Sequence, residues 1–203
     1  MTNNEPDTFL TMNRIRAAGT AALLTAALTQ PASAAAASNS ATTSIPVDPA
    51  TQIEMHVSAN CVQAVNRCDF NTTADLLTPD GPTGLPGDAW ARQTITVRSS
   101  DRNVWQEAGY SAPSGTPRAD KGANHDNVLS KMYKSLSDVE ISVTTFGGGP
   151  IERFQVDGDS VPTDWSTGQP NTRATFIACS VIQVVYGGVN LTTPTACAQT
   201  TFG

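Results

Sequence analysis

Two histidines limit the acid–base chemistry open to this sequence of 203 residues. His56 stands in the stretch QIEMHV, where alternating polarity places it on the polar side of an expected strand. His125 lies in NHDN, a composition that favours a loop or a helix start over a catalytic pair. We therefore predict a solvated His56 and assign no catalytic residue.

The order of His56, an aspartate and the Gly-Asp-Ser at 158–160 is similar to that of secreted chymotrypsin-like proteases. In that family two glycines follow the serine and let backbone N–H groups form the oxyanion hole. Here Val-Pro follows the serine, and Val57 stands where the family has a cysteine after its histidine. The sequence also lacks GxSxG, HExxH, P-loop and GxGxxG motifs, so no known catalytic motif indicates an enzyme.

Three aspartates, Asp157, Asp159 and Asp164, fall within the eight residues DGDSVPTD. Carboxylate oxygens at this spacing can bind Ca²⁺, although the central glycine and terminal glutamate of an EF-hand loop are missing. An aspartate-rich turn between two strands is the preferred interpretation, and a Ca²⁺ site is the alternative. No other metal site and no cofactor are expected.

Aromatic side chains are the remaining candidates for ligand binding, because they can stack on a sugar or anchor a protein partner. Trp165 lies in PTDWSTGQPNTR, a stretch of loop-forming residues, and is expected to be exposed. Trp165 and Tyr110 are the predicted ligand-binding residues. Trp90 stands at the entrance of an expected strand and is predicted to be buried.

The chain contains four cysteines, which are Cys61, Cys68, Cys179 and Cys197. In an exported protein they predict two disulfides, and four cysteines allow three connectivities. Local spacing permits Cys61 to bond Cys68 and Cys179 to bond Cys197, but the sequence does not choose among the three. A metal site is disfavoured, since the sequence has neither a CxxC motif nor a histidine close to these cysteines.

The second cysteine pair brackets an expected β-hairpin, CSVIQVVYGGVNLTTPTAC. Gly187-Gly188 suits a two-residue type I′ turn, because both central positions of that turn need positive φ. Pairing back from the turn sets Tyr186 against Val189 and leaves Cys179 one residue from Cys197, a gap that one β-bulge closes. The second strand has a proline near its end and is expected at a sheet edge. This register predicts one buried face, made of Ile182, Val184, Tyr186, Val189, Leu191 and Thr193.

Alternation of apolar and polar residues with period two recurs between turns rich in glycine and proline. It is clearest over residues 52–57, 93–98, 138–146, 151–156 and 173–179. The sequence therefore predicts a mainly β fold, an antiparallel sandwich or barrel of about seven to nine short strands with two disulfides. At most one short helix is expected, over 126–136, where apolar residues recur at helical spacing after Asp126 as N-cap.

The N-terminal segment has the order of a secretory signal peptide. A basic stretch at 12–16, an apolar stretch at 17–28 and Ala-Ser-Ala at 32–34 predict a signal peptide over residues 1–34, with Met12 as an alternative start. Residues 35–50 are small and polar and are expected to form a disordered spacer. Residues 51–203 are then expected to fold as a single β domain.

The net charge of −6 and the lack of basic clusters disfavour nucleic acid and anionic membrane surfaces as partners. No apolar stretch is long enough to cross a membrane as a helix, so no membrane insertion is expected. We therefore expect a secreted, extracellular, bacterial protein that binds a protein or glycan partner without catalysis. The first alternative is an extracellular hydrolase that uses carboxylates such as Asp88, Asp101 and Glu107. The second is a purely structural protein of the envelope or matrix.

Overall fold

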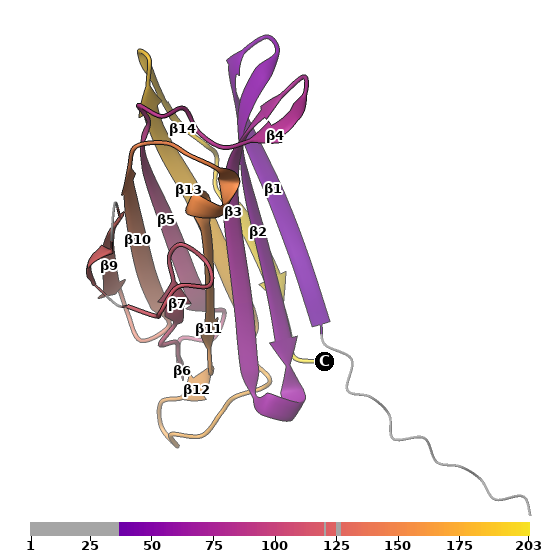
Figure 1. Cartoon of the computed structure of the whole chain (residues 1–203). Helices are drawn as coiled ribbons and strands as arrows, with labels where there is room; N and C mark the ends of the chain where they lie inside the picture. Colours follow the sequence, from indigo (N-terminus) through magenta and orange to yellow (C-terminus); the bar gives the residue numbers. More distant parts are fainter. Residues whose placement is uncertain (1–36, 120, 125–126) are drawn as a thin grey trace, which may run out of the picture. The chain divides into compact units, whose positions relative to one another are not determined.

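The computed structural model describes residues 37–119, 121–124 and 127–203. These residues form two antiparallel β-sheets and a two-stranded ribbon (Figure 1). The expected signal peptide over 1–34 lies outside the described residues, as do His125 and Asp126. Two short 3-10 helices, η1 (Gln63–Val65) and η2 (Ile151–Phe154), accompany the strands, which confirms the mainly β prediction. Among the described residues, no helix has the length and apolar character needed to span a membrane.

The first sheet has six strands in the order β1-β2-β3-β11-β7, with β4 also paired to β3. Their bounds are β1 (Ala37–Asp48), β2 (Thr51–Val62), β3 (Arg67–Thr78), β4 (Gly81–Thr83), β7 (Gly109–Ser111) and β11 (Gln155–Ser160). The centre of this sheet is the β2–β3 hairpin, whose register runs without interruption from Gln52 opposite Leu77 to Val62 opposite Arg67.

The second sheet has seven strands in the order β14-β13-β5-β10-β9-β8, with β15 also paired to β13. Their bounds are β5 (Trp90–Ser99), β8 (Gly122–Asn124), β9 (Asn127–Tyr133), β10 (Asp138–Phe146), β13 (Phe176–Tyr186), β14 (Val189–Thr192) and β15 (Ala196–Thr200). The ribbon pairs β6 (Val104–Trp105) with β12 (Thr163–Asp164). The chain forms more strands than the sequence predicted, because strands of two or three residues are too short to show a period.

Apolar side chains from both sheets form one hydrophobic core. In β2, Ile53, Met55 and Val57 are at most 2% exposed, whereas the polar residues that alternate with them lie on the opposite face. Strand β2 contacts both β13 and β15 of the other sheet, so the two sheets pack face to face. The described strands therefore form a sandwich and not a closed barrel.

Residues 37–48, predicted to be part of a disordered spacer, instead form strand β1. This strand pairs with β2, from Ala37 opposite Cys61 to Asp48 opposite Thr51. Its small apolar residues Ala41, Ile45 and Val47 are half-buried against the core. The prediction was wrong because it considered only how much apolar surface the segment itself could bury. The segment is stabilised instead by backbone hydrogen bonds to β2, a strand that the core already orders.

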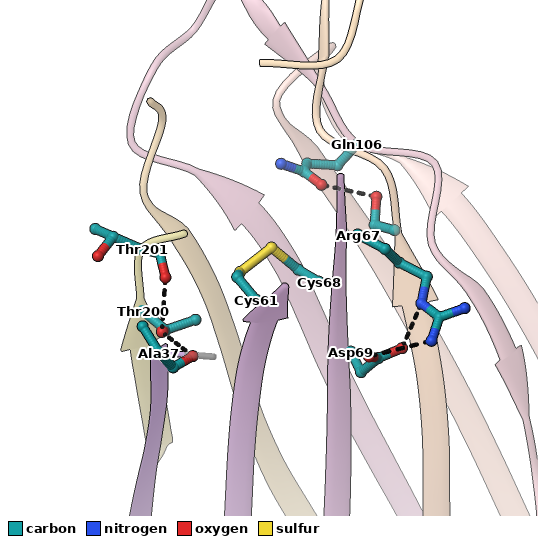
Figure 2. The surroundings of a disulfide bond; sticks show 9 residues. Ala37, Cys61, Arg67, Cys68, Asp69, Gln106, Thr200 and Thr201 are labelled. Atoms are coloured by element: carbon teal, nitrogen blue, oxygen red, sulfur yellow. Dashed lines mark hydrogen bonds and ion pairs between the residues drawn. A yellow bond between two sulfur atoms is a disulfide. The ribbon is translucent and has the colours of Figure 1, made fainter. Parts of the chain in front are cut away.

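Side-chain hydrogen bonds also tie β1 to the second sheet. Thr200 Oγ1 donates to the carbonyl oxygen of Ala37 at 2.8 Å, a contact visible in Figure 2. Thr43 Oγ1 donates to the carbonyl oxygen of Pro194 at 2.8 Å. The β domain therefore begins before residue 51.

The helix expected over 126–136 is not formed by the described residues of that range, of which 127–133 form strand β9. This strand pairs with β10, from Asn127 opposite Thr145 to Tyr133 opposite Val139. Leu129 is buried while Val128 is 48% exposed, so burial follows period two. The helical prediction was wrong because pairing with β10 outweighs a local pattern of apolar residues at helical spacing.

Both disulfides join neighbouring strands. Cys61 at the end of β2 bonds Cys68 at the start of β3 (Figure 2), and Cys179 of β13 bonds Cys197 of β15. The two cysteines of each pair lie directly opposite each other in the strand register. This confirms the two predicted disulfides and selects one of the three connectivities.

The predicted C-terminal hairpin is confirmed in its turn and in its register. Gly187 and Gly188 both have positive φ, at 48° and 85°, and Tyr186 pairs with Val189. Strand β14 forms a sheet edge, and the chain between β14 and β15 contains the irregularity that aligns the two cysteines. The expected buried face is confirmed in part: Ile182, Val184 and Thr193 are at most 4% exposed, whereas Tyr186, Val189 and Leu191 are half-buried.

Candidate functional site

A pocket of about 340 Å³ is lined by residues of the ribbon and of both sheets. Strands β6, β7, β9, β11 and β12 all contribute to its wall. Its lining residues are Trp105, Glu107, Ala108, Gly109, Arg118, Lys131, Asp159, Ser160, Val161 and Thr163. The pocket thus combines one large aromatic side chain with two cations and two carboxylates.

Two glycines allow the strands around this pocket to approach each other closely. A Cβ at position 158, in β11, would lie 2.3 Å from Phe70 Cζ and 2.4 Å from the carbonyl oxygen of Gly109. A Cβ at Gly109 would lie 2.7 Å from a guanidinium nitrogen of Arg118. Glycine at both positions therefore brings β7 against β11 and leaves room for the Arg118 side chain.

A buried hydrogen bond holds the β6–β7 segment against β11. Ser160 Oγ donates to Gln106 Oε1 at 2.7 Å and accepts the backbone N–H of Glu107 at 3.2 Å. Gln106 is fully buried, and its backbone N–H donates to the carbonyl oxygen of Leu136 in the turn between β9 and β10. These bonds fix the position of the segment that carries Trp105 and Glu107 on the pocket wall.

The charged groups of the pocket are arranged around Asp159. Arg118 forms an ion pair with the Asp159 carboxylate, and Arg67 Nε lies 3.9 Å from the same carboxylate. The hydrogen bond to Asp159 raises the pKa of Arg118, so the guanidinium stays a cation. Lys131 Nζ lies 5.7 Å from the centre of the Tyr133 ring. Donors and acceptors of hydrogen bonds therefore stand side by side on the pocket wall.

Two tryptophans are exposed at this end of the sandwich. Trp105 is 41% exposed and lines the pocket. Trp165 is 63% exposed, and its backbone N–H donates to the carbonyl oxygen of Asn103 at 2.9 Å, two residues before Trp105. An exposed tryptophan is a common anchor for a ligand, because its rigid side chain loses little conformational entropy on binding.

The two predicted ligand-binding residues occupy different environments. Trp165 is exposed, as expected, and does not line the pocket, although it follows the lining residue Thr163 by two positions. Tyr110 is fully buried in the core from β7, so its ring is not available to a ligand. Trp105 was not selected from the sequence, because its exposure depends on the short ribbon pairing. Trp90, predicted to be buried, is half-buried.

The aspartates proposed for Ca²⁺ have other partners. Asp159 pairs with Arg118, and Asp157 Oδ1 accepts the backbone N–H of Gly115 at 3.1 Å. Asp164 closes a turn: its Oδ1 accepts hydrogen bonds from Ser166 and Thr167, which lower the pKa of Asp164. Within the described part of the chain, these three side chains do not form a cluster that could hold a metal ion.

The carboxylates named for a hydrolase are not brought together. Glu107 lines the pocket, whereas Asp88 Oδ2 accepts the backbone N–H of Gly187 at 3.3 Å. Asp101 Oδ1 accepts the backbone N–H of Asn103 at 2.9 Å and stabilises the turn before β6. The structure therefore assigns two of these three residues to turns.

His56 is held more firmly than the predicted solvated strand histidine. Its side chain is 37% exposed, and its Nε2 lies 3.0 Å from Asp75 Oδ2 and 3.4 Å from Glu54 Oε2. Burial raises the pKa of Asp75 above its ordinary value, in opposition to the nearby imidazole. Asp75 was missed in the sequence because it belongs to the neighbouring strand β3, directly opposite Glu54.

The chain was compared with protein-family models, curated proteins and solved structures. No family model matches it, and no curated protein matches it. Among solved structures, the Clostridium perfringens NetB toxin in its membrane-inserted form is similar at a TM-score of 0.24 and 6% identity, over 82% of this chain and 92% of that chain. A likeness this weak carries no argument about fold or function.

Proposed function

We propose that the protein is an extracellular, non-enzymatic binding module whose ligand is a saccharide held in the Trp105 pocket. The observation that carries the proposal is the exposed Trp105 indole beside the charged wall of Arg118, Asp159, Lys131 and Glu107. The pocket volume of about 340 Å³ lies near the lower end of the range for small-molecule sites.

A saccharide fits the chemistry of this wall. One face of a pyranose ring is apolar and can cover an indole, while its hydroxyl groups both donate and accept hydrogen bonds. Carboxylates of Asp159 and Glu107 accept from such hydroxyls, and Arg118 and Lys131 donate to them. The two positive and two negative charges of the pocket wall cancel, so an uncharged sugar matches the pocket.

An extracellular location is consistent with the covalent structure. Both pairs of cysteines form disulfides, and disulfides persist in oxidising compartments outside the cytosol. The proposed location rests further on the signal peptide expected over residues 1–34, which also suggests a bacterial source. N-terminal sequencing of protein recovered from culture medium tests it: a mature chain that retains residues before Gln30 contradicts the proposed signal peptide.

Ligand binding can be tested with a glycan array followed by titration of any sugar that binds. Trp105→Ala should weaken binding at least about tenfold, because it removes the indole surface on which the sugar ring rests. Phe146→Ala is the matched control, since Phe146 is also an exposed aromatic residue, at 53%, and is not part of the pocket.

The proposal fails if no glycan binds the folded wild-type protein. It also fails if the Trp105→Ala and Phe146→Ala variants bind a glycan equally well. Capture of a protein partner that depends on Trp105, without glycan binding, would assign the pocket to protein recognition instead.

A further inference from the structure

Three potential metal ligands meet on the outer face of the β2–β3 hairpin. Glu54 and His56 stand two residues apart on β2, so they project from the same side of the strand. Asp75 lies directly opposite Glu54 on β3. One ligand atom from each of these three residues lies within 4.8 Å of the other two.

The separations suit a small tetrahedral ion. His56 Nε2 lies 3.0 Å from Asp75 Oδ2 and 3.4 Å from Glu54 Oε2. Two ligands bound to Zn²⁺ at about 2.0–2.1 Å in tetrahedral geometry are roughly 3.3–3.4 Å apart. The side chains are therefore already near the positions that such an ion requires.

A second observation concerns the buried carboxylate of Asp75. Asp75 is only 4% exposed, and its Oδ1 is buried without a hydrogen-bond partner among the described residues. An unpaired oxygen of a buried carboxylate is unfavourable, because burial removes its water and nothing replaces the lost hydrogen bonds. A cation bound through Oδ2, the oxygen that faces His56, would offset part of that cost by neutralising the charge of the carboxylate.

Neighbouring side chains orient two of the three ligands. Gln52 Nε2 donates to Glu54 Oε1 at 2.7 Å, which leaves Oε2 directed at His56. Thr42 Oγ1 lies 3.0 Å from His56 Nδ1. When Nδ1 carries the proton and donates it to Thr42, Nε2 presents the lone pair that a metal needs. Such outer contacts are usual around histidine ligands.

We propose that Glu54, His56 and Asp75 bind a Zn²⁺ ion, in a site separate from the Trp105 pocket. One imidazole and two carboxylates suit Zn²⁺ better than Ca²⁺ or Mg²⁺, which prefer oxygen ligands alone. Three protein ligands leave a fourth position, and the partly exposed His56 side chain allows a water molecule to reach it. The competing arrangement is a protonated His56 held between two carboxylates, with no metal.

The first experiment measures Zn²⁺ binding to the purified protein after removal of metals with a chelator. Isothermal titration should show one Zn²⁺ per chain and a raised melting temperature, reversed by the chelator. Ca²⁺ alone should give neither signal. Absence of Zn²⁺ binding by the folded wild-type protein overturns the proposal and favours the protonated-histidine arrangement.

Substitutions then locate the ion. Glu54→Gln should weaken Zn²⁺ binding by more than about 100-fold, and Thr42→Val, which keeps a β-branched side chain on an exposed strand, by about 10- to 100-fold. Two controls should bind Zn²⁺ as the wild type does. They are His125→Asn, which removes the other histidine, and Glu140→Gln, which removes a carboxylate paired with Lys134.

The variants remain informative if Glu54→Gln is unstable, because Thr42→Val alters no proposed ligand and no buried group. Zn²⁺ affinity that stays at the wild-type value in both Glu54→Gln and Thr42→Val overturns the assignment. So does loss of affinity in His125→Asn, which would place the ion elsewhere in the chain.

Discussion

Asp75 reaches His56 because β2 and β3 pair in a register that the first disulfide marks. Cys61 lies opposite Cys68, and counting back along both strands sets Glu54 opposite Asp75. The cysteine spacing thus contained the information needed to place Asp75 next to Glu54 and near His56. Its burial could not be predicted in the same way, because Asp75 belongs to the outward-facing positions of its strand, where a solvated carboxylate is the ordinary expectation.

Gly158 precedes the pocket residues Asp159 and Ser160 in β11 and has no room for a larger side chain. Gly158→Ala should lower the free energy of unfolding by about 2–3 kcal/mol or more, because its Cβ would overlap the Phe70 ring and the Gly109 backbone. Gly87→Ala is the control and should change stability little, since no atom of the described part of the chain lies within 4 Å of its Cβ position. Urea denaturation of both variants measures the difference, and equal midpoints would show that β7 and β11 are not packed as closely as described.

At the scale of strands, pairing with a neighbouring strand decided the secondary structure of two segments that local sequence patterns misassigned. β1 lacks strong apolar alternation, yet its backbone pairs along β2 and its Thr43 bonds Pro194, which follows β14. β9 carries apolar residues at helical spacing, yet it forms a strand because β10 offers a complete row of partners. In both segments the deciding contacts come from residues distant in the chain, so a short window of sequence misassigns them.

The β13–β14 hairpin offers a test of register. Val184→Asp should destabilise the protein by several kcal/mol, because it places an unpaired carboxylate in the core at a fully buried position. Gln183→Asp should cost little, since Gln183 lies on the opposite face, where its side chain bonds Asn190. Urea denaturation under oxidising conditions compares the two. Equal losses would mean that both faces are covered, and the reverse order would mean a register shifted by one residue.

At the scale of the whole molecule, each sheet carries one disulfide between adjacent strands. The bonded cysteines are 7 and 18 residues apart in sequence, and loops of that size contribute roughly 2.5–3 kcal/mol each in the chain-entropy model. Reduction should therefore lower the melting temperature by several degrees or more, as a large part of the roughly 5–15 kcal/mol typical of a domain is lost. Calorimetry with and without reductant tests this, after peptide mapping has verified both bonds. An unchanged melting temperature would contradict it.

The sequence by itself determined the mainly β class, the two-glycine hairpin with its buried face, and a small set of disulfide pairings that included the correct one. These features depend on period-two alternation, turn conformation and cysteine spacing, all of which act over short stretches of chain. The tertiary structure alone decided which residues form the Trp105 pocket and that Asp75 is buried beside His56. The pocket joins strands far apart in sequence. Asp75 and His56 lie on the consecutive strands β2 and β3, and there only the burial of Asp75 had to come from the folded structure. Both features follow from how the sheets and the ribbon pair and pack.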